Sequence, residues 1–243
     1  LYVFAVAGAG VIGAALAGWS SNNKFALLGG LRAASQMVSY EVAMGLSLVG
    51  TFMIYQSVQP GEMVAWQMSH CWGILVQPLA FVLFFTSAIA ETKRVPFDVP
   101  EGESEVVAGY FTEYSGLKFG MFASGELVEV CTSSALLTVV FLGGWQFPFV
   151  QNTGFEFHYL GIDISWAWAH FIVVLVGLLT FVLKVLGLVF LQLQIRWTLP
   201  RFRYDQIMML GWRILLPAAL LNVLLTGVAL LFVNGFATGA TTP

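Results

Sequence analysis

Six long apolar stretches constrain the fold of this chain more than any other feature of its sequence. A helix needs roughly 20 mostly apolar residues to cross the hydrocarbon core of a bilayer. The stretches that meet this requirement cover residues 1–18, 31–55, 71–91, 119–142, 167–197 and 208–234. Only 9% of the residues are charged, against about 25% in an average soluble domain, so too little polar surface exists to shield these stretches from water. The sequence therefore predicts an all-α polytopic bundle of six transmembrane helices that forms one domain, residues 1–243.

The lengths and limits of these stretches lead to two further expectations. The fifth stretch is longer than a perpendicular span requires, so we expect it to be tilted or to extend beyond the membrane. The first residue already lies inside an apolar stretch, and the chain has neither an initiator Met nor a signal peptide with a cleavage site. We therefore expect the chain to be a fragment that lacks its true N-terminal part.

The basic residues between the stretches predict the orientation of the bundle. Loops 56–70 and 143–165 contain no Lys or Arg, and neither does the C-terminal tail. The basic residues that flank the other loops are Lys24, Arg32, Lys93, Arg94, Lys118, Arg196, Arg201 and Arg203. All of them fall on one side of an alternating six-span topology, and basic loops stay in the cytoplasm. The sequence thus predicts that both ends of the chain lie outside the cytoplasm.

Composition and motifs disfavour several classes of function. The net charge of −3 argues against nucleic-acid binding. Cys71 and Cys131 lie far apart, which is typical of reduced thiols rather than of a disulfide or a metal site. The sequence contains no paired-His motif, Walker loop or Ser-His-Asp set. We therefore expect the chain to bind no metal and to hold no redox cofactor of its own.

The first apolar stretch contains a misleading glycine pattern. Gly8, Gly10 and Gly13 match the GxGxxG fingerprint of dinucleotide-binding folds. That fingerprint also needs an acid about 20 residues further on, at the end of a second strand, and the first acid here lies deep in another apolar stretch. Gly10, Ala14 and Gly18 are instead spaced four apart, which favours a small-residue face for close packing of helices.

The acidic residues concentrate in one segment, ETKRVPFDVPEGESEVVAGYFTEY, residues 91–114. Prolines break any regular helix there, so we predict a long cytoplasmic loop that contains Glu101, Glu103 and Glu105. Clustered carboxylates near a basic residue such as Arg94 can hold and pass protons near neutral pH. The alternative is an ordinary solvated acidic loop, and the residues alone leave both readings open.

Four charged residues of the predicted spans are candidates for a site: Glu41, Glu126, Glu129 and Lys184. A charge at mid-bilayer costs roughly 2.5–3.5 kcal/mol on insertion scales, so such side chains face the bundle interior and mark ion or proton paths. The alternative is a buried structural ion pair, for example between Lys184 and one of the glutamates. We favour the proton path for Glu41 and Glu126, and both readings stay open for Glu129 and Lys184.

Three segments together resemble a known family. The segments are AETKRVPFDVPEGESEVVAGYFTEYSGLKFG, GWSSNNKFALLGGLRAASQMVSYEV and LPRFRYDQIMMLGWRILLPAALLN. They are similar to the quinone-site membrane subunit, called H in bacteria, of respiratory complex I, the proton-pumping NADH:quinone oxidoreductase. The resemblance covers essentially the whole chain. It implies the last six helices of an eight-helix subunit in the bacterial inner membrane.

The resemblance also implies roles for particular residues. Glu41, Glu91 and Glu126 match positions of a funnel of buried glutamates that leads toward the pump subunits. Glu101, Glu103 and Glu105 match the acidic loop between the quinone and this funnel, while Arg94, Phe97 and Asp98 match the loop beside the quinone chamber. Gly8 is a departure, because some members of the family carry an acid near this position, so the entrance of the funnel is one carboxylate short or uses water.

By the same resemblance the chain is an enzyme subunit without a redox cofactor of its own. Quinone is the substrate, whereas flavin and iron–sulfur clusters belong to partner subunits. The implied partners are the hydrophilic quinone-site and cluster-bearing subunits, small membrane subunits and antiporter-like subunits, all in a lipid bilayer.

Three alternatives remain at the level of sequence. The membrane subunit of a proton-pumping hydrogenase shares the helices and the carboxylates but not NADH as donor. A stand-alone proton or ion transporter is compatible with the buried acids, although the chain shows no internal repeat of the kind many transporters have. The third alternative is a purely structural anchor for soluble partners. The buried glutamates would then have no function, although inserting them into the membrane costs free energy.

Overall fold

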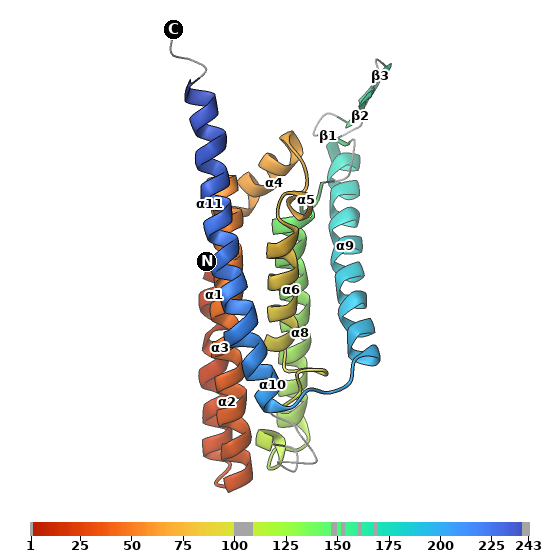
Figure 1. Ribbon diagram of the computed structural model, residues 1–243. Coiled ribbons are helices and arrows are strands. Elements are labelled where there is room, and N and C mark those ends of the chain that lie inside the picture. Colours follow the sequence, from red (N-terminus) through yellow and green to blue (C-terminus); the bar gives the residue numbers. More distant parts are fainter. Residues whose placement is uncertain are drawn as a thin grey trace.

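The computed structural model describes residues 2–99, 109–146, 150–151, 154–159, 162–167 and 170–239. Within them, long helices stand side by side, and a small sheet lies at one end of the bundle (Figure 1). The helices are α1 (Tyr2–Ala7), α2 (Ala9–Ser20), α3 (Lys24–Tyr55), α4 (Pro60–Ser69), α5 (Gly73–Val76), α6 (Pro78–Glu91), α8 (Leu117–Phe141), α9 (His170–Thr198), α10 (Tyr204–Met209) and α11 (Leu216–Gly239). A 3-10 helix covers Gly109–Phe111, and a π-helix, Leu210–Leu215, joins α10 to α11.

Four helical segments are long and apolar enough to cross a membrane. They are Lys24–Tyr55, Leu117–Phe141, Phe171–Thr198 and Tyr204–Phe232. Two shorter apolar segments, Phe4–Ser20 and Pro78–Glu91, occupy the places of the other two predicted spans. Pro78–Glu91 is short because the backbone is interrupted at Gln77 between α5 and α6, whereas Phe4–Ser20 runs through the turn at Gly8 between α1 and α2. The described structure is therefore that of a polytopic helical membrane protein.

Local sequence signals explain where several helices begin. The Asn23 side chain accepts a hydrogen bond from the main-chain N–H of Phe25, 3.1 Å, and so caps α3. Pro60 and Pro78 open α4 and α6, where a residue without an N–H donor costs nothing. Glu62 lies in the first turn of α4, where a carboxylate is favoured by the helix dipole.

A small sheet lies in one loop of the otherwise helical bundle. Residues 150–167 contain three antiparallel strands in sequential order, β1 (Val150–Gln151), β2 (Gly154–Tyr159) and β3 (Ile162–Ala167). In β2 and β3, Phe155 pairs with Trp166 and Phe157 with Ile164. The sequence of these strands alternates apolar and polar residues, which is the period of a strand. The fifth apolar stretch therefore becomes helical only from His170, after β3 has ended.

α3 packs against α2, α6 and α11. Its contact with α2 depends on small residues. A Cβ at Gly30 would lie 2.9 Å from the main-chain oxygen of Ala14 and 3.1 Å from Cα of Gly18. A Cβ at Gly18 would lie 2.7 Å from the main-chain oxygen of Ala26. The predicted small-residue face is thus confirmed at Ala14 and Gly18, where the backbones of α2 and α3 approach closely.

α9 differs from the other long helices in how little of it the chain covers. It stands apart on one side of the bundle in Figure 1, and most of its leucines and valines are exposed. Such a surface suits contact with lipid or with another membrane protein.

We predict that Gly30→Val destabilises the bundle by about 1–3 kcal/mol, because the new side chain would meet the backbone of α2 rather than a movable side chain. Gly45→Val is the matched control, since Gly45 lies on the same helix and a Cβ there would have no neighbour within 4 Å. The measurement is the midpoint of thermal unfolding in mild detergent. Equal midpoints for the two variants would contradict this account of α2–α3 packing.

Candidate functional site

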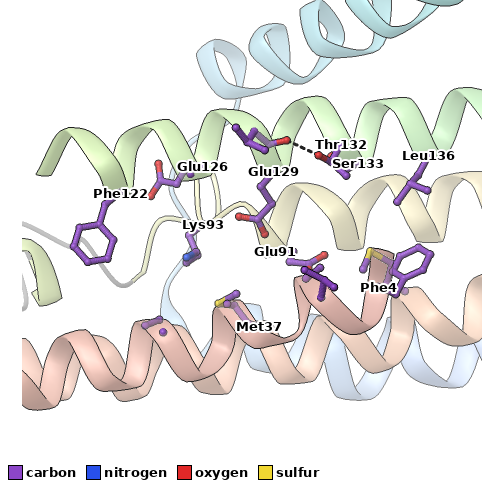
Figure 2. Close-up of a pocket in the computed structure, with 18 of the residues that line it drawn as sticks. Phe4, Met37, Glu91, Lys93, Phe122, Glu126, Glu129, Thr132, Ser133 and Leu136 are labelled. Carbon is purple, nitrogen blue, oxygen red and sulfur yellow. Dashed lines mark hydrogen bonds between the residues drawn. The ribbon is translucent and has the colours of Figure 1, made fainter. Parts of the chain in front are cut away.

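A cavity of about 590 Å³ lies between α1, α2, α3, α6 and α8. Most of its wall is apolar, and its charged residues are Glu91, Lys93, Glu126 and Glu129. Figure 2 shows Glu91 and Lys93 in the space between α8, which carries both other glutamates, and the opposite wall, which carries Met37. An apolar cavity with a few convergent charged groups is the usual form of a functional site.

Glu91 and Lys93 reach the cavity because α6 ends between them. Glu91 is the last residue of α6 and is only 6% exposed. The main-chain N–H of Thr92 still bonds to the carbonyl of Ala88, and Lys93 then adopts a left-handed conformation with φ of 54°. This conformation is uncommon for a residue with a side chain and turns the chain sharply. The Lys93 ammonium lies 5.9 Å from the centre of the Tyr110 ring, beside the cavity.

Glu126 and Glu129 share one face of α8 because they are three residues apart. Glu126 forms an ion pair with Arg94, 3.7 Å between Oε2 and Nε, and both side chains are largely buried. The charges of Lys93, Arg94 and Arg196 act on Glu126.

Glu126 and the deeper carboxylates also act on one another. The charges of Lys93, Arg94 and Glu126 act on Glu129, and those of Glu129, Glu41 and Lys93 act on Glu91. These carboxylates therefore lie close enough for their charges to interact.

Glu41 joins this group from α3. It lies on the same helical face as Met37 and Met44, and both methionines line the cavity. Its carboxylate points at the junction between α1 and α2, where Oε1 lies 2.7 Å from the position that a Cβ on Gly8 would occupy. The structure thus brings together Glu41, Glu91, Glu126 and Glu129, which come from three different helices.

The loop after α6 is fixed to α3. The buried amide of Gln36 donates hydrogen bonds to the carbonyls of Ala90, 2.8 Å, and Phe97, 2.9 Å. The Phe97 ring packs against Tyr40 and Phe202. Phe97 is therefore a buried anchor of this loop, Arg94 reaches α8, and Asp98 is partly buried next to the anchor. The predicted acidic residues Glu101, Glu103 and Glu105 lie outside the described residues.

Lys184 has a different environment. Its ammonium group donates hydrogen bonds to the main-chain carbonyls of Leu142, 2.7 Å, Gly144, 3.2 Å, and Gln146, 2.6 Å. It also lies 5.0 Å from the centre of the Trp72 ring. These carbonyls follow the C-terminal end of α8, where main-chain acceptors lack helical partners. The arrangement supports a structural role for Lys184 and links α9 to α8.

Two contributors to the site were not singled out from the sequence. From the sequence, Lys93 served only to predict the orientation of its loop. No sequence motif indicates the left-handed backbone conformation that places its side chain beside the cavity. Gln36 was detectable in principle, since an amide in an apolar helical stretch needs hydrogen-bond partners when it is buried. Among the described residues, no group of three or more His, Cys, Asp or Glu side chains is placed to hold a metal ion.

Fold and site together define a polytopic membrane protein whose helices enclose a cavity lined by carboxylates. The sequence model described as NADH dehydrogenase matches residues 1–227, and the chain belongs to this family. It is 43% identical over 95% of its length to the first H subunit of the NADH-quinone oxidoreductase of Cytophaga hutchinsonii, and covers 64% of that protein. It is 45% identical over 95% of its length to the corresponding H subunit of Flavobacterium psychrophilum, and again covers 64%. It is 44% identical over 94% of its length to H subunit 1 of the NADH-quinone oxidoreductase of Geobacter sulfurreducens, and covers 59% of that protein. The chain thus spans less than two thirds of these relatives.

We predict that Lys184→Met lowers the stability of the protein by about 1–3 kcal/mol, because buried carbonyls lose their donor while the apolar stem is retained. Lys118→Met, at the exposed start of α8, is the control. Thermal unfolding in detergent reports the difference. If Lys184→Met were as stable as the control but defective in proton transport, the structural role would be refuted in favour of a proton-path role.

Proposed function

We propose that this chain is the membrane subunit of a proton-translocating NADH:quinone oxidoreductase of the bacterial inner membrane. In this role it helps to form the chamber in which quinone is reduced, and it couples that reduction to proton movement through its buried glutamates. The observation that carries the proposal is the cavity in which Glu91, Glu126 and Glu129 converge beside the loop of Arg94. The names of the relatives supply quinone as the substrate and other subunits of the oxidoreductase as partners.

The topology in this proposal has six spans. The two shorter apolar segments cross the membrane together with the four long ones, and neighbouring helices satisfy the interrupted backbone. The ends of α2, α6 and α9 and the starts of α3, α8 and α10 lie at the lower end of the bundle in Figure 1. Lys24 begins α3 and Arg196 lies in the last turn of α9, so basic residues gather at that end. By the positive-inside rule it faces the cytoplasm.

Electrostatics provides the coupling. Partner subunits, which carry the flavin and the iron–sulfur clusters, deliver electrons to the quinone, and its reduction creates negative charge in a chamber of low dielectric constant. The loop of Arg94, Phe97 and Asp98, together with Glu101, Glu103 and Glu105, borders this chamber. Negative charge there competes with Glu126 for Arg94, and the change in Glu126 passes to Glu129, Glu91 and Glu41. Moving one charge across the membrane costs about 2.3 kcal/mol per 100 mV, so the redox step must drive the transfer.

We predict that Glu126→Gln lowers the number of protons transported per electron severalfold while the complex still assembles, because the amide keeps the size of the side chain but cannot carry the proton. Glu62→Gln is the control, since Glu62 is exposed on α4. The measurement is NADH-driven quinone reduction and proton uptake in inverted membrane vesicles. Normal proton transport by Glu126→Gln would contradict a role of Glu126 in the proton path.

Purification of the tagged full-length protein in mild detergent tests the assignment to NADH:quinone oxidoreductase itself. Flavin and iron–sulfur subunits that co-purify with the tagged protein, with NADH-dependent activity, would support it. Hydrogenase subunits without NADH activity would move the protein to the hydrogenase branch, and a protein without partners would favour a stand-alone transporter.

We predict that Arg94→Ala raises the KM for quinone severalfold, because the loop loses its tie to α8. Arg201→Ala is the control, since Arg201 is exposed beyond the end of α9. Steady-state kinetics over a range of quinone concentrations separates KM from kcat. An unchanged KM together with unchanged loop stability would count against a place for Arg94 beside the chamber.

A further inference from the structure

The interruption of the first helix lies directly against the carboxylate of Glu41. Gly8 lies between Ala7, the last residue of α1, and Ala9, the first residue of α2, and its N–H bonds to the carbonyl of Phe4, 3.0 Å. Its backbone is right-handed, with φ of −58° and ψ of −23°, which any residue adopts. Conformational freedom is therefore not the reason for a glycine here. The reason is space, because a Cβ would lie 2.7 Å from Oε1, 3.5 Å from Cδ and 3.7 Å from Oε2 of Glu41.

The other glycines of the same pattern do not share this contact. A Cβ at Gly10 would meet only the terminal methyl of Met37, at 3.4 Å, and a Cβ at Gly13 would meet nothing within 4 Å. Gly18 lies against the backbone of α3 and serves packing. Of these four glycines, only Gly8 makes room for a charged group.

We propose that Gly8 is a positioning residue for Glu41: by carrying no side chain, it admits the Glu41 carboxylate to the α1–α2 junction at the edge of the cavity. From there the charge of Glu41 acts on Glu91, which lies in the cavity itself. This inference rests on the proposed function, because it concerns the alignment of one member of the proton path.

A side chain at position 8 acts on the carboxylate rather than on the fold. The atom that a Cβ would meet is the far end of a flexible side chain, so Glu41 moves and the backbone stays. To regain an ordinary contact distance the carboxylate withdraws by about 1 Å. A displacement of this size is enough to break the alignment that a proton transfer requires.

The test uses Gly8→Ala in the assembled complex, in inverted membrane vesicles. We expect normal assembly and a severalfold lower ratio of protons transported to electrons transferred. Gly45→Ala is the matched control, because Gly45 lies one turn from Glu41 on α3 and a Cβ there has no neighbour within 4 Å. A Gly8→Ala variant with the ratio of the control would overturn the inference.

Combining Gly8→Ala with a second substitution at Glu41 distinguishes a role of Gly8 in positioning Glu41 from a role in helix packing. Glu41→Asp shortens the side chain by one methylene, so Gly8→Ala should cost less in that background, and any loss of assembly should be restored there. In the Glu41→Gln background Gly8→Ala should cost nothing further. An equal loss in all backgrounds, or failed assembly that Glu41→Asp does not restore, would mean that Gly8 acts through packing and would overturn the inference.

The roles of Gly8 and Glu41 fail in different ways. If Glu41→Gln alone lowers the ratio but Gly8→Ala does not, Glu41 keeps its place in the proposed function and only the role of Gly8 falls. If Glu41→Gln transports protons normally, Glu41 leaves the proton path, and the positioning role of Gly8 falls with it.

Discussion

Ionisable side chains inside the bundle need partners or space that the protein supplies, because lipid offers neither hydrogen bonds nor counter-charges. Glu126 has Arg94, and Lys184 has three main-chain carbonyls beyond the end of α8. Glu41 has the space that Gly8 leaves. Glu91, at the end of α6, faces a cavity large enough for several water molecules.

Interruptions of the helices lie beside polar side chains. Between α5 and α6 the buried amide of Gln77 donates to Thr226, 2.6 Å, and accepts from Asn222, 3.2 Å, so α11 supports the break. In the π-helix before α11, the indole N–H of Trp212 donates to the hydroxyl of Ser39, 3.0 Å. At Gly8 the neighbour is a carboxylate. Irregular backbone within a membrane is tolerated when protein surrounds it, and such places are often functional.

The sequence predicts the features that depend on near neighbours and misses those that depend on distant ones. Apolar stretches identified the helices, and the spacing of Gly10, Ala14 and Gly18 identified the tight α2–α3 contact, because both are local patterns. The strands at 154–167 were detectable from their alternation but were hidden by the adjoining apolar run. The glutamates predicted from the sequence include three of the four charged residues that line the cavity, Glu91, Glu126 and Glu129. The three carbonyls at Lys184 and the contact of Gly8 with Glu41 join segments that lie far apart in the chain, and no local pattern encodes them.

The basic residues near the cavity lie where α6 gives way to the loop of Arg94. Lys93 lines the cavity directly after α6 ends at Glu91, and Arg94 pairs with Glu126 on α8, 3.7 Å. In the proposed function a negative charge at this loop therefore acts first on the pair of Arg94 and Glu126, because the interaction of two charges weakens as their separation grows. Glu129 then responds through Glu126, which lies three residues away on the same face of α8.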